Sequence, residues 1–228
     1  GALLVVRPDA GIEEPADFAD KKIASPQLGN TQDVALRSWL LENDVPAREN
    51  GGPTEVIPTA NPDALALFRE GEIDGAWAPE PWATRLIQEG DGEVYLDERD
   101  LWPDGQFVTT QLIVATEFLE EHPDTVRDLL QAHVEATQFI NENPEEAKRL
   151  VNANIEEVTG EALPEDVIDA AWENLEITYD PIASSLLESA AGAYELELLD
   201  EEPNLEGLYA LDLLNEVLAE KGLAEVET

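Results

Sequence analysis

The stretch from Ser25 to Val34 contains the residue types of an anion-binding turn, because a glycine and three polar residues follow an apolar segment. The first backbone N–H groups of a helix have no partner within the helix and carry a partial positive charge. They bind a carboxylate, sulfonate or phosphate without lysine or arginine, and a glycine lets a ligand approach the backbone. Plain helix capping by Asn30 or Thr31 explains the same residues equally well. The candidate binding residues are Gly29, Asn30, Thr31 and Gln32.

A second segment, from Asp74 to Arg85, also runs from a strand pattern into a helix start, and it carries two tryptophans. Trp77 and Trp82 could form the walls of a pocket, with their indole N–H groups directed at ligand oxygens. The alternative is that both are core residues. Glu80 places a negative charge at the same helix end. It could pair with Arg85, cap the helix or bind an ammonium group of a ligand.

Signatures of catalysis are missing from the sequence, which has no nucleophile elbow, Walker loop, zinc-protease motif or dinucleotide glycine pattern. The two histidines, His122 and His133, are expected at the surface or in satisfied core positions. The absence of cysteine excludes disulfides and thiolate chemistry. Acidic residues are so abundant that no catalytic pair stands out, and the cluster at 97–100 is expected to be solvated surface. The sequence therefore predicts a protein without turnover, cofactor or metal.

The charge of the chain is extreme, with 52 acidic residues against 12 basic ones and a net charge of -40. Such a surface repels nucleic acid and anionic lipid, so neither is an expected partner. The acids accompany apolar periodicity throughout, which is typical of a folded protein with an acidic surface from a salt-loving organism. In molar salt the Debye length falls to ~3 Å, which screens the self-repulsion. The alternative is a highly soluble acidic protein from an ordinary organism.

The elements that must position these residues alternate in the first half of the chain. Strands are expected at 3–6, 23–25, 55–57, 73–77 and 93–96, with a longer one at 107–115. Helices are expected at 31–42, 62–70 and 81–89, with one short helical turn at 15–20. Asn61 is expected to cap the second of these helices, with proline at its first position. This alternation predicts an α/β architecture.

The second half of the chain shows helix patterns only. They are expected at 116–121, 123–141, 144–159, 164–177, 182–199 and 205–220, several with a proline near the start. No apolar run approaches the ~20 residues of a membrane span. Amphipathic helices must bury their apolar stripes, but this half offers few strands. The chain also has no methionine and begins directly in a strand pattern, so we expect a sheet supplied by residues upstream of Gly1.

Three separated blocks of the sequence resemble one known family. In this order and spacing, IASPQLGNTQDVALRSWLLEN, NPDALALFREGEIDGAWAPEPWATRL and DERDLWPDGQFVTTQLIVATEFLEEHPDTVRDLL are similar to substrate-binding proteins of ABC importers of the nitrate/sulfonate/taurine type. The later ATQFINENPEEAKRLVN resembles the helices of their C-terminal lobe. The similarity extends from Gly1 to about residue 218, which is nearly the whole chain.

The resemblance implies a periplasmic-binding-protein-like (type 2) α/β fold of two lobes joined by two crossing strands. Residues 1–7 would be the crossing strand from lobe one and 8–108 the ligand-binding lobe two. Residues 109–228 would be the returning strand and the C-terminal helices of lobe one, whose N-terminal part is absent. A natural fragment of this kind would expose apolar stripes and associate.

The resemblance also implies a function and its residues. The Gly29–Gln32 turn matches the family's oxoanion-binding helix start, the stretch from Trp77 through Glu80 to Trp82 matches a second ligand-facing loop, and Thr110 lies on the returning strand. The protein would be the extracytoplasmic binding component of an ABC importer for a small oxoanion such as an aliphatic sulfonate, taurine or nitrate. It would work with a membrane permease, as a monomer when full length, at the periplasm or cell surface and tethered as a lipoprotein. The alternative is a protein of the same fold that binds or makes a thiamine pyrimidine precursor.

Overall fold

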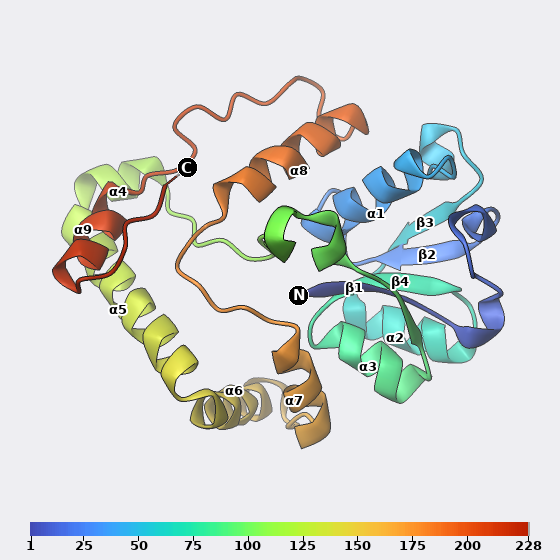
Figure 1. Cartoon of the computed structure of the whole chain (residues 1–228), viewed down its shortest axis with the longest axis horizontal. Coiled ribbons are helices and arrows are strands. Elements are labelled where there is room, and N and C mark those ends of the chain that lie inside the picture. Colours follow the sequence, from blue (N-terminus) through green and yellow to red (C-terminus); the bar gives the residue numbers. More distant parts are fainter. Residues whose placement is uncertain (228) are drawn as a thin grey trace. The chain divides into compact units, whose positions relative to one another are not determined.

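The computed structural model describes residues 1–227, which form two compact units (Figure 1). Unit 1 comprises Gly1–Thr109, Pro164–Leu175 and Ser185–Pro203. Unit 2 comprises Thr110–Leu163, Glu176–Ser184 and the described residues from Asn204 onward. Each unit therefore combines segments that lie far apart in the sequence. Within residues 1–227, none of the helices has both the length and the apolar character that a membrane span requires.

Unit 1 is built on a five-stranded sheet with the order β3-β2-β4-β1-β5. The strands are β1 (Ala2–Val6), β2 (Lys22–Ser25), β3 (Glu55–Pro58), β4 (Gly75–Pro79) and β5 (Glu93–Asp97). β2 runs parallel to β3 and β4, whereas β1 is antiparallel to β4 and β5. The carboxyl ends of β2, β3 and β4 therefore meet at one edge of the sheet. These strands confirm the five predicted in the first part of the chain, although β4 begins two residues later than predicted.

Two layers of helices cover this sheet because successive residues of a strand point to opposite faces. Leu4 and Val6 pack with Trp39 of α1 (Thr31–Glu42), and Leu3 and Val5 pack with residues of α2 (Asn61–Glu70) and α3 (Trp82–Gly90). Figure 1 shows α1 on one face of the sheet and α2 and α3 on the other. All of β1 is buried as a result. The core of unit 1 thus lies on both faces of one sheet.

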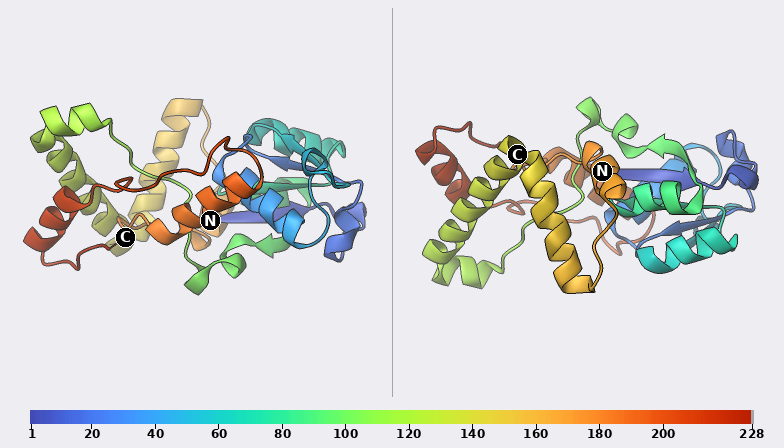
Figure 2. Two further views of the ribbon diagram at one scale, coloured as in Figure 1. Left: turned by 90° about the horizontal axis from the view of Figure 1, so that it is seen from above. Right: turned by 90° about the horizontal axis from the view of Figure 1, so that it is seen from below.

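Short 3-10 helices and two later helices complete unit 1. The 3-10 helices are η1 (Pro8–Ala10), η2 (Pro15–Phe18), η3 (Arg48–Asn50), η4 (Glu98–Leu101) and η5 (Pro103–Gly105). α7 (Glu165–Glu173) packs against α3. α8 (Ala183–Glu195), which begins in unit 2, lies along α1, where Ala193 and Leu196 contact Val34 (Figure 2). The amide of Asn50 reinforces this contact by donating to the carbonyl of Leu196 at 3.3 Å.

Unit 2 is helical in the part of the chain that the structure describes. It contains α4 (Thr116–Glu121), α5 (Pro123–Glu142), α6 (Pro144–Thr159) and α9 (Asp212–Glu220). Its core is a seam between α5 and α9, where Val134 packs with Leu214, Val217 and Leu218. Ion pairs of Arg127 with Glu220 and of Lys221 with Glu135 flank this seam.

Several helices predicted in the second half are shorter than expected, and one predicted strand is wrong. The helix predicted at 205–220 begins only at Asp212, because Gly207 adopts a left-handed conformation (φ 73°). α8 stops before Glu197, which has φ 59°, and α7 ends at Glu173 rather than at 177. The strand predicted at 107–115 is not formed. Its apolar residues have no partner strand within residues 1–227, and the Ile113 side chain is 88% exposed.

Candidate functional site

The carboxyl ends of the parallel strands open onto a shallow pocket in unit 1. The pocket is open to solvent and, in this conformation, encloses no room for a water-sized molecule. Strand ends and helix starts supply its walls, which include Ser25, Thr59, Asn61, Trp77, Trp82 and Leu86. In open α/β sheets, ligands bind outside the carboxyl ends of the strands. The pocket therefore lies where the fold would place a ligand.

The Gly29–Gln32 turn follows β2 directly and opens α1. Gly29 has φ 74°, a left-handed conformation that glycine adopts without strain, although nothing would touch an added Cβ there. Asn30 is the N-cap, and its side-chain oxygen accepts the backbone N–H of Asp33 at 2.9 Å. Capping by Asn30 is thus confirmed. Within the described residues, the backbone N–H groups of Thr31 and Gln32 have no acceptor in the protein, but Gln32 is only 5% exposed.

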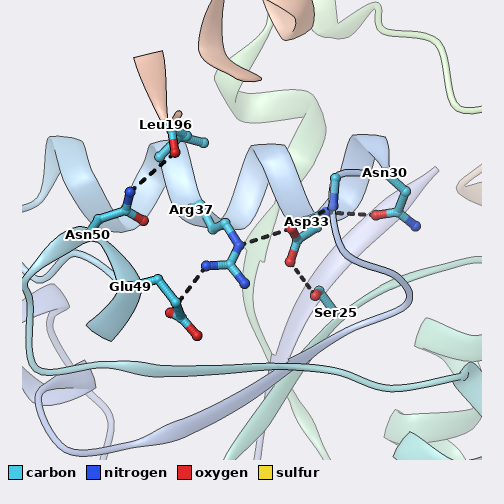
Figure 3. Close-up of polar contacts among 8 residues, drawn as sticks. Ser25, Asn30, Asp33, Arg37, Glu49, Asn50 and Leu196 are labelled. Carbon is cyan, nitrogen blue, oxygen red and sulfur yellow. Dashed lines mark hydrogen bonds and ion pairs between the residues drawn. The ribbon is translucent and has the colours of Figure 1, made fainter. Parts of the chain in front are cut away.

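A buried network behind this turn holds the end of β2 against the start of α1 (Figure 3). Asp33 is fully buried and accepts hydrogen bonds from Ser25 Oγ at 2.5 Å, from Gly29 N–H at 2.9 Å and from Arg37 Nε at 2.9 Å. Arg37, also buried, reaches Glu49 at 3.3 Å. The hydroxyl hydrogen of Ser25 is used in the hydrogen bond to Asp33. Toward the pocket, the Ser25 oxygen can therefore only accept hydrogen bonds. The guanidinium of Arg37 compensates the charge of Asp33.

Sequence reasoning missed this network and part of the pocket wall. The i,i+4 spacing of Asp33 and Arg37 was the signal for the ion pair. For Thr59 and Asn61, the only indication in the sequence was their position after the end of β3. Asn61, predicted as the N-cap of α2, is instead its first residue, and Ala60 precedes it as the cap.

Trp77 is a core residue, as the alternative interpretation of the second segment held. Its side chain is fully buried on the α1 face of the sheet, and its Nε1 donates to Glu98 Oε2 at 2.6 Å. The prediction that this N–H faces a ligand oxygen is therefore wrong, because the carboxyl group of Glu98 already accepts it. Trp77 still contributes to the wall of the pocket from below.

Trp82 and Glu80 have separate roles at the start of α3. Trp82 is half-buried in the pocket wall, and the guanidinium of Arg85 lies 4.6 Å from its ring centroid. Arg85 bonds to Glu89 at 2.5 Å rather than to Glu80. Glu80 accepts the N–H of Thr84 at 3.1 Å and the side-chain amide of Asn174 at 2.6 Å. Of the three roles left open for Glu80, the structure shows helix capping.

Glu98 corrects the expectation that residues 97–100 are solvated surface. It is 1% exposed, and both of its oxygens accept indole N–H groups, from Trp77 at 2.6 Å and from Trp102 at 3.4 Å. Burial raises the pKa of Glu98 to about 7, an effect that the indole hydrogen bonds only partly oppose. Nothing in the sequence distinguishes this acid from its neighbours.

Thr110 is exposed and begins unit 2, in the stretch that was predicted as a strand. The pocket lies wholly in unit 1, so it does not include Thr110. Of the predicted site residues, Trp77 and Trp82 line the pocket, whereas the Gly29–Gln32 turn and Glu80 are not among its lining residues.

An α/β unit with a pocket at the carboxyl edge of its sheet defines a class of ligand-binding domains. A model of the NMT1-like family matches residues 9–155, so the chain belongs to this family. It is 28% identical over 127 residues to the taurine-binding periplasmic protein of Escherichia coli (strain K12), across 54% of this chain and 37% of that protein. It is 26% identical over 130 residues to the nitrate/nitrite binding protein NrtA of Nostoc sp. (strain PCC 7120), across 56% and 28% of the two chains.

The fold resembles that of the periplasmic sulfonate-binding protein SsuA from Methylobacillus flagellatus KT, with a TM-score of 0.72 and 17% identity over 100% of this chain and 69% of that one. The desulfurization enzyme DSZB shares the fold at a TM-score of 0.61 and 18% identity, over 96% and 76% of the two chains. These matches confirm the resemblance to the nitrate/sulfonate/taurine-type binding proteins and the α/β fold. The chain spans about a third of the curated relatives it matches.

Proposed function

We propose that this chain carries the ligand-binding lobe of the extracytoplasmic substrate-binding component of an ABC importer, and that its ligand is a small oxoanion such as an aliphatic sulfonate, taurine or nitrate. The observation that supports this most is the free N–H pair of Thr31 and Gln32 at the edge that bears the pocket, inside the region that matches the family. Its relatives include a taurine-binding periplasmic protein and a nitrate/nitrite binding protein.

In this proposal the Gly29–Gln32 turn binds the oxoanion through backbone N–H groups, which carry partial positive charge at a helix start. Gly29 keeps the approach to the backbone open, and Asn30 fixes the first turn. Trp82 supplies a flat apolar wall and an indole N–H. Trp77 and Glu80 support the wall from behind, and Thr110, which lies in an irregular segment rather than on a strand, is kept as a proposed contact of the full-length protein. We also propose that residues 8–108 form the ligand-binding lobe.

The location and partners of the protein are proposed from the same relatives. The relatives support a periplasmic location and a permease partner, and we propose that the full-length protein is a monomer tethered as a lipoprotein. The net charge of -40 disfavours nucleic acid as a partner and favours a high-salt habitat. We propose binding without turnover, because the sequence relatives are binding proteins. These relatives favour the oxoanion over the pyrimidine precursor.

Thermal unfolding in ~2 M salt against taurine, alkanesulfonates, nitrate, bicarbonate and a pyrimidine precursor tests the proposal. A ligand at ~100 times its Kd should stabilise the native state by about 2.7 kcal/mol. Stabilisation by the pyrimidine precursor alone, or by none of the compounds, would contradict the oxoanion assignment.

A proline variant tests the turn itself. Thr31 is the first residue of α1, where proline fits the helix and removes the N–H together with the side-chain hydroxyl. Thr31→Pro should fold normally and lose most of the stabilisation by the anion. The matched control is Thr116→Pro at the first position of α4 in unit 2, which should keep it. Equal ligand responses in the two variants would exclude the Thr31 N–H as a contact.

A further inference from the structure

One buried carboxyl group joins two indoles that come from different parts of unit 1. Glu98 is the first residue of η4, directly after β5, and it is 1% exposed. Oε2 accepts Trp77 Nε1 at 2.6 Å, and Oε1 accepts Trp102 Nε1 at 3.4 Å. Trp77 belongs to the central strand β4, and Trp102 ends η4. Glu98 therefore connects the central strand β4 with the segment that leaves the sheet.

The segment held in this way continues to the end of unit 1. The ring of Trp102 stacks on that of Phe107, with centroids 6.0 Å apart and planes 14° apart. The next residue, Val108, donates its backbone N–H to Ser185 Oγ at 3.1 Å. Unit 1 gives way to unit 2 one residue after Thr109. The contact between Trp102 and Glu98 thus anchors the connection between the pocket and the rest of the chain.

The charged groups around Glu98 do not neutralise it. Arg99 is held by Asp97 on the surface, with hydrogen bonds of 2.5–3.0 Å, and Glu80 is held by Asn174 and by the N–H of Thr84. The charge of Asp97 raises the pKa of Glu98 and the amino group of Gly1 lowers it. Within the described residues, no ion pair to Glu98 is formed. Burial dominates, so the charge of this group changes near neutral pH.

We propose that Glu98 is a positioning residue that clamps Trp102, and with it the segment leaving β5, to Trp77 on the central strand β4, and that proton uptake by Glu98 loosens the clamp on the Trp102 side. A carboxylate accepts on both oxygens, whereas a protonated carboxyl group has one O–H donor. The short bond to Trp77 keeps Oε2 as the acceptor. The proton then resides on Oε1, whose neutral hydroxyl oxygen accepts more weakly than a carboxylate oxygen, so the bond from Trp102, already long at 3.4 Å, weakens.

NMR spectra of the five indole N–H groups test this inference, with peaks assigned from Trp→Phe variants and followed from about pH 5 to about pH 9. The peaks of Trp77 and Trp102 should shift with one shared midpoint at about pH 7, and those of the other tryptophans should not. Glu98→Gln should abolish both shifts. A shift of Trp77 or Trp102 that survives in Glu98→Gln, or no shared midpoint in the wild type, would overturn the proposal.

Two further variants report on the clamp even if Glu98→Gln fails to fold. Removing the indole bond by Trp102→Phe should raise the midpoint seen at Trp77, because this bond lowers the pKa of Glu98. Asp97→Asn should lower the midpoint, because the charge of Asp97 raises that pKa. A midpoint that moves in neither variant would show that Glu98 is not the titrating group. None of these measurements requires a ligand, so they stand apart from the proposed function.

Discussion

The two units differ in where their apolar side chains lie. Unit 1 buries residues on both faces of its sheet, and all of β1 is enclosed. Unit 2 buries one seam between α5 and α9 and leaves other large apolar residues exposed, such as Leu129 on α5 and Val158 on α6. A sheet offers two faces to cover, whereas a helix buries only one stripe and needs a neighbour for it. Apolar periodicity alone therefore does not determine how much surface a region buries.

The units also differ in how they use charge. The buried charged residues among those described are Asp33, Arg37 and Glu98, and all three lie in unit 1. The ion pairs of unit 2, such as Arg149 with Glu146, lie at the surface. All five tryptophans belong to unit 1. Tryptophan fluorescence therefore reports the unfolding of unit 1, and far-UV circular dichroism reports both units, which makes the comparison measurable.

The largest effect is expected from the buried ion pair. Arg37→Met leaves the carboxylate of Asp33 buried without its cation, so the free energy of unfolding of unit 1 should fall by about 3–5 kcal/mol. Urea unfolding followed by both tryptophan fluorescence, which reports unit 1, and far-UV circular dichroism, which reports both units, measures it. The matched change Arg149→Met removes an exposed pair in unit 2 and should leave the transition unchanged. Equal losses of stability in Arg37→Met and Arg149→Met would mean that burial does not decide how much each ion pair stabilises the protein.

Two leucines compare the cores directly. Leu4→Ala creates a cavity in the sheet of unit 1 and should cost about 2–5 kcal/mol in the free energy of unfolding. Leu129, which is 53% exposed on α5, should tolerate the same change within about 0.5 kcal/mol. Urea titrations followed by circular dichroism measure both variants. A comparable loss in Leu129→Ala would show that unit 2 buries this side chain in solution.

Glu98 gives unit 1 a pH dependence of its own. Its pKa is about 7 in the folded protein and lower in the unfolded chain, so between these values the folded state binds more protons. Its contribution to the free energy of unfolding is therefore full below about pH 4.5 and is lost as the pH rises to about 7, by about 3 kcal/mol in all. Other carboxyl groups titrate too, so the quantity to measure is the difference between wild type and Glu98→Gln. If the difference in the free energy of unfolding between wild type and Glu98→Gln does not change with pH, Glu98 does not contribute this pH dependence.

The smallest effect concerns two asparagines at helix starts. Asn30 caps α1 through its side-chain oxygen, so Asn30→Ala should cost about 1 kcal/mol. Asn143 precedes α6 but makes no side-chain cap; its amide donates instead to the carbonyl of Phe139. Asn143→Ala should therefore cost less, as judged from unfolding midpoints by circular dichroism. The reverse order would argue that the cap of α1 adds nothing to stability.

Much of the fold followed from local signals. Gly71 ends α2 as predicted, and Pro123 and Pro144 mark the starts of α5 and α6 as predicted. The failures arose where a distant partner decides the structure. The stretch 107–115 has the composition of a strand, but a strand requires a second strand to bond to.

The candidate site also has features that neighbouring residues determine and features that distant partners determine. The turn at Gly29–Gln32 and its cap at Asn30 were predictable because both rest on neighbouring residues. The burial of Glu98 was not, because it depends on Trp77, which is distant in sequence and reaches it only through the pairing of β1 with β4 and β5. For the same reason, the direction of the Trp77 indole N–H was predicted wrongly.

The position of β1 has a consequence for how the chain assembles. Its residue Leu3 pairs with Ala78 on one side and Asp97 on the other, so this strand depends on partners that are synthesised much later than it is. Closing such long loops slows folding, because the entropy is lost before the contacts form. Until β4 and β5 emerge, Ala-Leu-Leu-Val-Val is an unpaired apolar segment of the kind that aggregates. The dense negative charge of the residues that follow would keep the nascent chains apart during that interval.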